Sequence, residues 1–285
     1  GRVSRVMMVP EHVRADFVRM MDRPDEALEL ARVAPLVAAE SDLEVDIDGE
    51  LRQLEGWADQ LKSRVTPDLN NLQKLARLRN FVFEELGFRG DRRDYYSPSN
   101  SLLHQVMKRR RGIPLTLSIV FMELGWRIGI PFEGVAFPGH FLVRLAGEPH
   151  DLLLDPYKRG MMVHEEDCRQ MLRETTGGRM SYDPALTASV GKRDIVARLL
   201  HNLKGAYLRS GDDEKALAAV DRLLVLRPDD VEEIRDRGLL LFRMQKYGRA
   251  LDSLTAYLEA AAGATDRETI EGHIKTLRSL LATLN

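Results

Sequence analysis

Cysteine is almost missing from this chain, since Cys168 is the one thiol among 285 residues. A single thiol cannot form an intrachain disulfide, and there is no Cys-x-x-Cys pair to hold zinc. Long apolar runs are missing too: the longest candidate, Ile113–Met122, falls short of the roughly 18 residues that span a bilayer. The first residues lack the apolar segment of a secretory leader. We therefore expect a cytoplasmic protein without a metal centre or a membrane span.

An excess of charge of one sign is also missing. The chain has 42 basic and 44 acidic residues, and from Gly191 onward 16 basic and 15 acidic. A dedicated nucleic-acid domain usually carries a strong basic excess, so nucleic acid is not an expected partner. The local exception is the run Lys108–Arg111, with Arg89, Arg92 and Arg93 upstream. Such a run is either a solvated helix end or an anion site.

The C-terminal third contains an internal repeat of 34 residues. The segment Val196–Pro228 aligns with Asp230–Ala262, which places Ala216 on Ala250. Each unit is predicted to form two helices, and the amphipathic tail Asp266–Leu284 a capping helix; the expected helices cover about 195–210, 213–226, 231–245 and 248–262. This period resembles the tetratricopeptide repeat, which implies an all-α domain with a groove for peptides.

The N-terminal part is predicted to be helical. Apolar residues recur at three- and four-residue spacing over 25–39, 43–65 and 69–86. Pro35 is expected to kink or end the first of these helices, and Gly87 to end the third.

The centre of the chain changes character. Gly112-Ile113-Pro114 is expected to open a helix that runs to about Ile128. Segments rich in β-formers follow, at 132–137, 140–145 and 152–154, and predict a small antiparallel sheet. The predicted fold class is therefore α+β. We expect N-terminal helices and the sheet over 1–160, a linker or clasp over 161–192, and the all-α repeat over 193–285.

Two residues in the sheet region follow the order of a thiol-hydrolase site. His140 lies in Gly139-His140-Phe141, and Asp155 ends the next apolar segment. In such enzymes a cysteine at a helix start attacks, a histidine acts as base, and an acid orients the histidine. The region resembles the transglutaminase-like core, in which Gly-x-Cys opens the helix. Aligned on that pattern, Gly112-Ile113-Pro114 puts Pro114 in the cysteine position, so the nucleophile is missing.

No other residue replaces the nucleophile convincingly. Ser118 lies one turn further into the helix, where a hydroxyl usually bonds to the carbonyl four residues back. Cys168 follows Glu165, Glu166 and Asp167, and acidic neighbours raise the pKa of a thiol. The histidines are too scattered for a metal site, and no glycine-rich phosphate loop appears, so no cofactor is expected.

A second resemblance covers nearly the whole chain. The sequence is similar to the bacterial SirB-type (YchA-like) family, a transglutaminase-like domain joined to tetratricopeptide repeats whose members are loosely described as regulators. The resemblance is carried by Asn100–Leu103, Arg111–Ser118, Phe137–Val143, Asp155–Tyr157 and Ile234–Leu239. In that family the Gly-Ile-Pro is a shared trait, which implies that Pro114 is not peculiar to this chain.

Two functions remain open from the sequence. The first is a non-catalytic interaction protein that binds a protein or peptide in the repeat groove, where the candidate binding residues are the basic ones on the first helix of each repeat, Lys204, Arg235, Arg237 and Arg243. The second is an enzyme with altered amide or peptide hydrolase or transferase chemistry that uses His140 and Asp155. If no chemistry survives, these two residues are expected to form a structural hydrogen-bonded pair.

Overall fold

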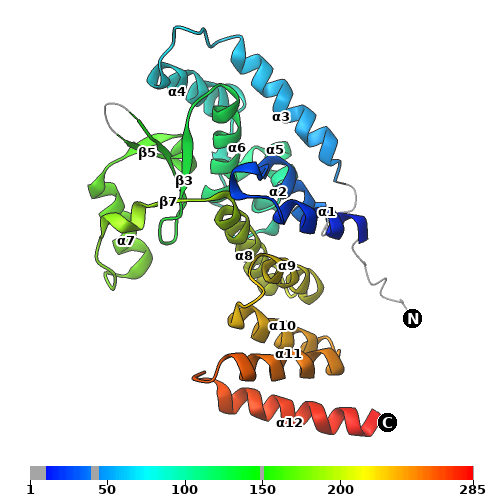
Figure 1. Cartoon of the computed structure of the whole chain (residues 1–285). Helices are drawn as coiled ribbons and strands as arrows, with labels where there is room; N and C mark the ends of the chain where they lie inside the picture. The colour runs from blue at the N-terminus through cyan, green and yellow to red at the C-terminus, as the bar shows by residue number, and fades with distance from the viewer. Residues whose placement is uncertain (1–10, 40–44, 148–150, 285) are drawn as a thin grey trace. The chain divides into compact units, whose positions relative to one another are not determined.

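The computed structural model describes residues 11–39, 45–147 and 151–284. The chain divides into two compact units, residues 1–199 and 200–285. Each unit has its own arrangement of helices, and each is described by itself below (Figure 1).

Four helices open the first unit, and local capping explains two of their starts. They are α1 (Glu11–Met21), α2 (Leu30–Ala39), α3 (Ile47–Lys62) and α4 (Asn71–Arg79), with a π-helical turn at Asn80–Glu85. The Asp46 carboxylate accepts a hydrogen bond from Gly49 N at the start of α3, and Asn70 forms a capping box with Gln73. The helix expected from residue 25 begins only at α2, after a short 3-10 turn, and it continues through Pro35.

Helix α6 (Pro114–Arg127) forms the centre of this unit. All residues from Pro114 to Gly125 are buried, because helices α2, α3, α4 and α5 (Leu103–Arg109) and two strands of the sheet lie against it (Figure 1). A helix that is buried on every side must be apolar all round, which explains why this sequence shows no polar stripe. The predicted start at Pro114 is confirmed, and the helix ends at Arg127.

The sheet of the first unit has five strands in the order β6-β5-β4-β3-β7. Every neighbouring pair is antiparallel, so the predicted α+β class with a small antiparallel sheet is confirmed. The strands are β3 (Phe132–Val135), β4 (Leu142–Leu145), β5 (Leu152–Asp155), β6 (Met161–Val163) and β7 (Ser189–Val190). The two outer strands come from 161–192, the segment for which the sequence predicted a linker or clasp.

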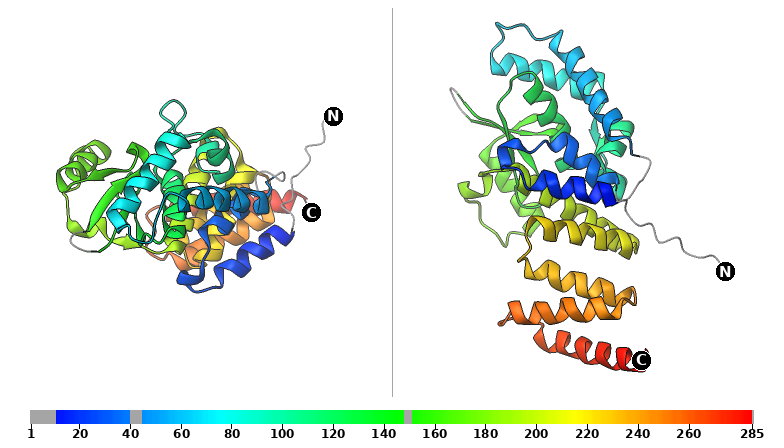
Figure 2. Two further views of the ribbon diagram at one scale, coloured as in Figure 1. Left: turned by 90° about the horizontal axis from the view of Figure 1, so that it is seen from above. Right: turned by 45° about the vertical axis from the view of Figure 1, so that its right-hand side comes forward.

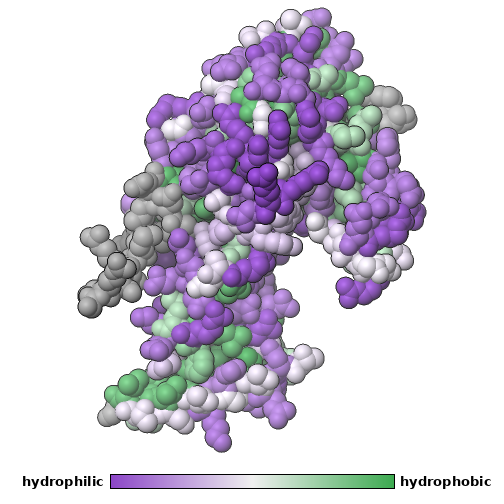
Figure 3. Space-filling model, turned by 180° about the vertical axis from the view of Figure 1, so that it is seen from behind, coloured by the Kyte–Doolittle hydropathy of each residue, from purple (hydrophilic) through white to green (hydrophobic). Residues whose placement is uncertain are grey.

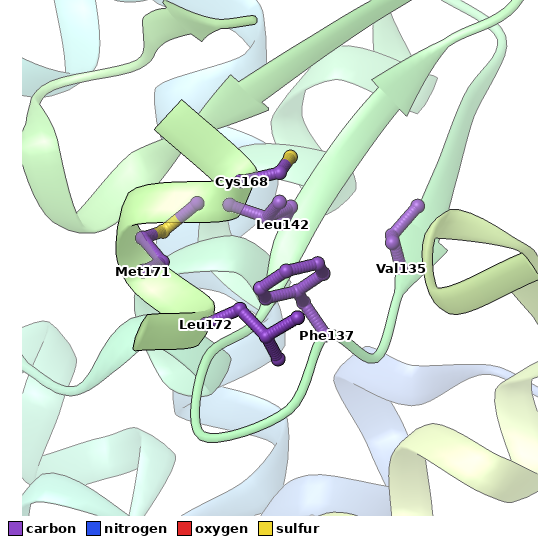
Figure 4. Close-up of a cluster of buried hydrophobic side chains, with 6 residues drawn as sticks. All are labelled: Val135, Phe137, Leu142, Cys168, Met171 and Leu172. Carbon is purple, nitrogen blue, oxygen red and sulfur yellow. The ribbon is translucent and has the colours of Figure 1, made fainter. Parts of the chain in front are cut away.

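Helix α7 (Glu165–Thr176) of that same segment packs on the sheet domain. Its residues Cys168, Met171 and Leu172 point toward Phe137 and Leu142 in a buried apolar cluster that also includes Val135 (Figure 4). The segment therefore contributes to the core of this unit. Its strands have only two and three residues, too few for a periodic pattern to be recognised in the sequence.

The second unit is all-helical. Helix α8 (Lys192–Ser210) runs into it, and α9 (Asp213–Leu226), α10 (Val231–Arg243), α11 (Tyr247–Ala260) and α12 (Arg267–Leu284) follow, stacked in chain order (Figure 2, right). The aligned small residues Ala216 and Ala250 are fully buried. Gly238 lies so close to Leu254 that a Cβ there would be 2.6 Å from a leucine methyl carbon.

The last helix leaves apolar side chains uncovered. Apolar residues gather on α12, the lowest helix in Figure 3, and Leu284 in its final turn is 70% exposed. Within the residues that the structure describes, no helix has both the length and the apolar composition to cross a membrane.

Glu50 in α3 makes the stability of the fold depend on pH. Burial, together with the neighbouring Asp46 carboxylate, raises the pKa of Glu50 from 4.5 to about 7. Its Oε2 atom is buried and has no hydrogen-bond partner among the described residues. A pKa raised on folding means that the folded state binds the proton more tightly than the unfolded state does. Protonated Glu50 therefore supports the full stability of the fold below the unfolded pKa of 4.5, and this contribution is lost as the pH rises through about 7.

We predict that Glu50→Gln leaves the free energy of unfolding little changed at about pH 5 and raises it at about pH 8, by about 1 kcal/mol after allowance for partial exposure. Urea unfolding at the two pH values measures the difference. The exposed Asp48 in the same turn provides the control, because Asp48→Asn should leave the pH dependence as in wild type. An equal effect of Glu50→Gln at both pH values would contradict the prediction.

Candidate functional site

A short parallel strand pair fixes the start of the central helix. Strand β1 (Arg89–Gly90) pairs with β2 (Arg111–Gly112), which places Gly90 beside Gly112, two residues before Pro114. The hydroxyl of Thr116 accepts a hydrogen bond from Ile113 N, 3.2 Å away, and donates to the carbonyl of Asn100 at 2.7 Å. The N–H of Ile113 and the hydroxyl of Thr116 thus have hydrogen-bond partners inside the protein.

The loop between β1 and α5 is built on a buried polar network. Asn100 is fully buried, and its amide donates to the carbonyl of Asp94 at 2.6 Å. Arg109 bridges the loop by donating to Asn100 Oδ1 at 3.3 Å and to Asp91 Oδ2 at 2.9 Å. The Asp91 carboxylate also accepts from the backbone of Asp94, and these bonds lower the pKa of Asp91 against the raising effect of burial. The Asn100 amide also donates to the carbonyl of Tyr95, so buried hydrogen bonds hold the backbone that carries this ring.

His140 and Asp155 form the hydrogen-bonded pair that the sequence suggested. His140 Nε2 donates to Asp155 Oδ2 at 2.9 Å. The Asp155 side chain is 1% exposed and that of His140 is 15% exposed. The second carboxylate oxygen of Asp155 accepts from the backbone N–H of Tyr157 at 3.0 Å. The carboxylate is therefore used twice, once to orient the imidazole and once to hold the turn after β5.

Hydrogen bonds from Arg198 hold the turn that carries His140. Arg198 Nη2 donates to the carbonyl of Phe137 at 3.1 Å and to that of His140 at 2.8 Å. Gly139 adopts φ +69°, and a Cβ there would overlap Thr175, so glycine is required between these two carbonyls. Burial lowers the pKa of the Arg198 guanidinium. Arg198 was not among the predicted site residues, although an arginine inside the apolar pattern that begins at Ile195 was a signal for it.

One aromatic ring packs against the imidazole, and a second ring packs against the first. The ring of Tyr157 packs edge-on to that of His140 with 6.1 Å between centroids, and Tyr95 packs edge-on to Tyr157 at 6.1 Å. Burial is the largest cause of the raised pKa of both phenols. A Cβ on Gly90 would overlap the ring of Tyr157. Since Gly90 pairs with Gly112, the rings link the histidine to the start of α6.

The candidate nucleophiles are placed as follows. Pro114 lies in the first turn of α6 and is buried. Ser118 is fully buried, and its hydroxyl has no hydrogen-bond partner among the described residues, so the expected bond to the preceding turn is not made. Cys168 is buried in the cluster under α7, where burial and the charges of Asp167 and Glu165 raise its pKa. In the described part of the chain, the one hydrogen bond of the His140 ring is to Asp155.

The four basic residues predicted to bind a partner are all bonded within the repeat unit. Lys204 is 9% exposed and donates to Glu233 at 2.8 Å and to Asp236 at 2.7 Å. The other three are less buried: Arg235 pairs with Asp236 and Asp266, Arg237 donates to Ser253 Oγ, and Arg243 pairs with Asp213.

Half of the basic run Lys108–Arg111 is structural. Arg109 holds the loop described above, and Arg110 stacks on Trp57, 4.6 Å from the ring centroid, while donating to the carbonyl of Leu86. Arg110 has φ +59° and ends α5 in the left-handed conformation. Lys108 is exposed and Arg111 half-buried. Among the described residues, no group of histidine, cysteine and acidic side chains could hold a metal ion.

Comparison with known proteins agrees with both units. The transglutaminase-like superfamily matches residues 49–201, and the tetratricopeptide repeat matches residues 203–274. A UPF0162 protein of Xylella fastidiosa (strain 9a5c) is 33% identical over 256 residues, 89% of this chain and 91% of that protein. A UPF0162 protein of Vibrio cholerae is 32% identical over 197 residues, 68% of this chain and 72% of that protein.

A eukaryotic relative shares part of the chain. F-box only protein 21 of Mus musculus is 28% identical over 183 residues, which is 60% of this chain and 28% of that protein. The matches to the bacterial proteins extend over most of both chains, and they confirm the resemblance that the sequence motifs indicated. The chain belongs to the UPF0162 (SirB/YchA-like) family, with a transglutaminase-like domain followed by tetratricopeptide repeats.

Proposed function

We propose that this protein is a non-catalytic interaction protein, in which a transglutaminase-like core without a nucleophile is joined to a repeat unit that binds a protein partner. The observation that carries the proposal is the surroundings of His140. Its imidazole is oriented by Asp155 and packs against Tyr157, yet it makes no hydrogen bond to a thiol or hydroxyl in the described residues. Acyl transfer of the papain type requires such a nucleophile within reach of the base.

Hydrolase or transferase chemistry with an altered mechanism is the second candidate. It is favoured by the geometry of the His140–Asp155 pair, because a buried carboxylate at 2.9 Å is the arrangement that orients a catalytic imidazole. It is disfavoured by the burial of Ser118 and Cys168, which keeps both from a substrate. The following variants distinguish the two candidates.

We predict that Pro114→Cys restores a reactive thiol if Pro114 occupies the place of the lost nucleophile. A thiol at the start of α6 beside His140 should form a thiolate–imidazolium pair, with a pKa below about 7.5. The pKa is read from the ultraviolet absorbance of the thiolate, and reactivity from alkylation by iodoacetamide at neutral pH.

Two controls accompany this variant. Ser118→Cys puts a thiol one turn deeper in the same helix and should react as slowly as Cys168. Adding His140→Ala to Pro114→Cys should raise the thiol pKa again. If the new thiol is no more acidic than Cys168 and does not respond to His140→Ala, Pro114 does not occupy the nucleophile position.

We predict that the His140–Asp155 pair is structural. Asp155→Ala removes the acceptor for both His140 and the backbone of Tyr157, and should lower the free energy of unfolding by about 1 to 3 kcal/mol. His140→Ala should cost less, because its ring is partly exposed. The double variant should cost less than the sum of the two, since both remove one shared bond.

Urea unfolding measures these energies, and Asp151→Ala serves as control because its carboxylate is 56% exposed. That control should change stability by less than about 0.5 kcal/mol. Single variants at His140 or Asp155 that are as stable as wild type would favour a site kept for function, because such sites commonly sacrifice stability.

The interaction itself is tested with the full chain immobilised by a tag. We predict that it retains a partner from lysate of its own source, and that Arg243→Glu on α10 weakens the retention. The Arg243 side chain is 55% exposed, and an exposed ion pair such as the one with Asp213 is weak enough to be exchanged for a carboxylate of the partner. Arg249→Glu is the matched control, since Arg249 is an exposed cation on the neighbouring helix α11. Retention of nothing above a tag-only column would count against the proposed function. Equal retention by both variants would remove the α10 face from it.

A further inference from the structure

Basic side chains from three separate segments meet next to the His140 site. The β1–β2 pair places Arg89 directly beside Arg111, and Arg92 and Arg93 follow β1. The 3-10 turn Pro156–Lys158, which carries Tyr157, lies against β1 and adds Lys158. We call Arg89, Arg92, Arg93, Arg111 and Lys158 the cationic surface. All but the half-buried Arg111 are exposed.

The cationic surface lacks counter-charges within the described chain. None of its five members makes an ion pair there, and the side chain of Arg111 donates to the carbonyl of Arg110 at 3.1 Å. The neighbouring acids are already used. Asp91 is bonded to Arg109 and Asp155 to His140, while Glu84 pairs with Arg159 and Glu85 with Arg64. Asp94 is the exposed acid of this loop, and it makes no ion pair with another described residue. One acid thus faces five cations.

This arrangement is unfavourable in the protein alone. Like charges at opposed positions on neighbouring strands repel each other, and Arg89 and Arg111 are such a pair. Several other cations of the same unit are matched: Arg109, Arg127 and Arg159 each have a carboxylate partner. Repulsion that the fold leaves uncompensated is relieved when an anionic ligand binds.

We propose that the cationic surface binds an acidic segment of a protein partner, beside Tyr157 and the His140–Asp155 pair. The inference rests on the proposed function, which says that the partner is a protein. It adds the chemistry of the bound segment and the surface to which that segment binds. Four of the five cations are arginines, whose planar guanidinium groups bind carboxylates through two parallel hydrogen bonds. The Tyr157 ring, in contact with Gly90, provides an apolar flank for the backbone of the segment.

A protein segment suits this surface better than a nucleic acid. The whole chain has a net charge of −2, so its remaining surface repels a polyphosphate backbone. Nucleic-acid proteins commonly neutralise about six to ten phosphates, more than five cations can do. A short run of aspartate or glutamate requires fewer contacts. Nucleic acid therefore becomes an outcome of the test.

The test measures binding of a fluorescein-labelled glutamate-rich peptide to the full chain by fluorescence anisotropy, at about 20 mM salt where screening is weak. The same peptide with glutamine in place of glutamate, a single-stranded DNA oligonucleotide of equal charge and inorganic phosphate are the comparison probes. The variant Arg92→Glu/Arg93→Glu/Lys158→Glu reverses three exposed members of the cationic surface. The matched control Arg14→Glu/Lys62→Glu/Arg77→Glu makes the same change in net charge at exposed sites elsewhere in the unit.

We expect the glutamate peptide to bind and the glutamine peptide not to bind, with affinity lost as salt is raised. The surface variant should weaken binding at least about tenfold and the control less than about twofold. Circular dichroism melts check that both variants are folded. The double variant Arg92→Gln/Lys158→Gln removes charge without reversing it, and it should lose an intermediate amount of peptide affinity.

Four results would overturn the proposal. The first three are no binding of the glutamate peptide, equal losses in the surface variant and the control, and tighter binding of the oligonucleotide. Phosphate that competes as well as the peptide would reduce the site to one for small anions and would also overturn it. These outcomes are separate from the proposed function, because a partner retained equally by wild type and the surface variant would keep the interaction role and reject this surface.

Discussion

The burial of α6 on all sides is the constraint on which the first unit depends. A helix surrounded by four others and a sheet cannot send its first N–H groups or its hydroxyls to water, so their partners must lie inside the protein. The Ser118 hydroxyl has no such partner among the described residues, whereas Thr116 does. Thr116 bonds to Asn100 and Ile113, and Asn100 in turn holds the loop that carries Tyr95. Pro114 fits this arrangement, because proline in the first turn has no N–H to satisfy. Pro114 therefore suits a buried helix start.

The position of His140 is fixed mainly by hydrogen bonds to the backbone of its turn, and less by the hydrogen bond of its ring. Arg198 holds the carbonyls on either side of Gly139, and the positive φ of Gly139 lets the chain pass Thr175. Asp155 then fixes the ring. A pair positioned this firmly suits a catalytic base, and it equally suits a bond between two neighbouring strands. The observed orientation therefore suits either role, and in the described residues the ring makes its one hydrogen bond to Asp155.

Features that depend on local pattern could be predicted from the sequence. The repeat helices follow from apolar periodicity, and α9 has the predicted bounds 213–226. The His140–Asp155 pair follows from strand order. Features made by contact between distant segments could not be predicted. The short edge strands β6 and β7 lack periodicity, and Arg198 and Asp91 gain their roles only when loops far apart in the chain meet.

Contacts between distant segments also decide which charged residues are paired and which are unpaired. Sequence alone favoured Lys204, Arg235, Arg237 and Arg243 as ligand-binding cations, since basic residues at the first helices of repeats suit acidic peptides. Each proves to be bonded to an acid or a hydroxyl of its own unit, and Lys204 is nearly buried between two carboxylates. Arg89 and Arg111 are distant in sequence and adjacent in the fold, and neither makes an ion pair with another described residue. Because a charge already paired must lose its partner before it can bind another, the unpaired cations are the ones with free energy left to give to a ligand.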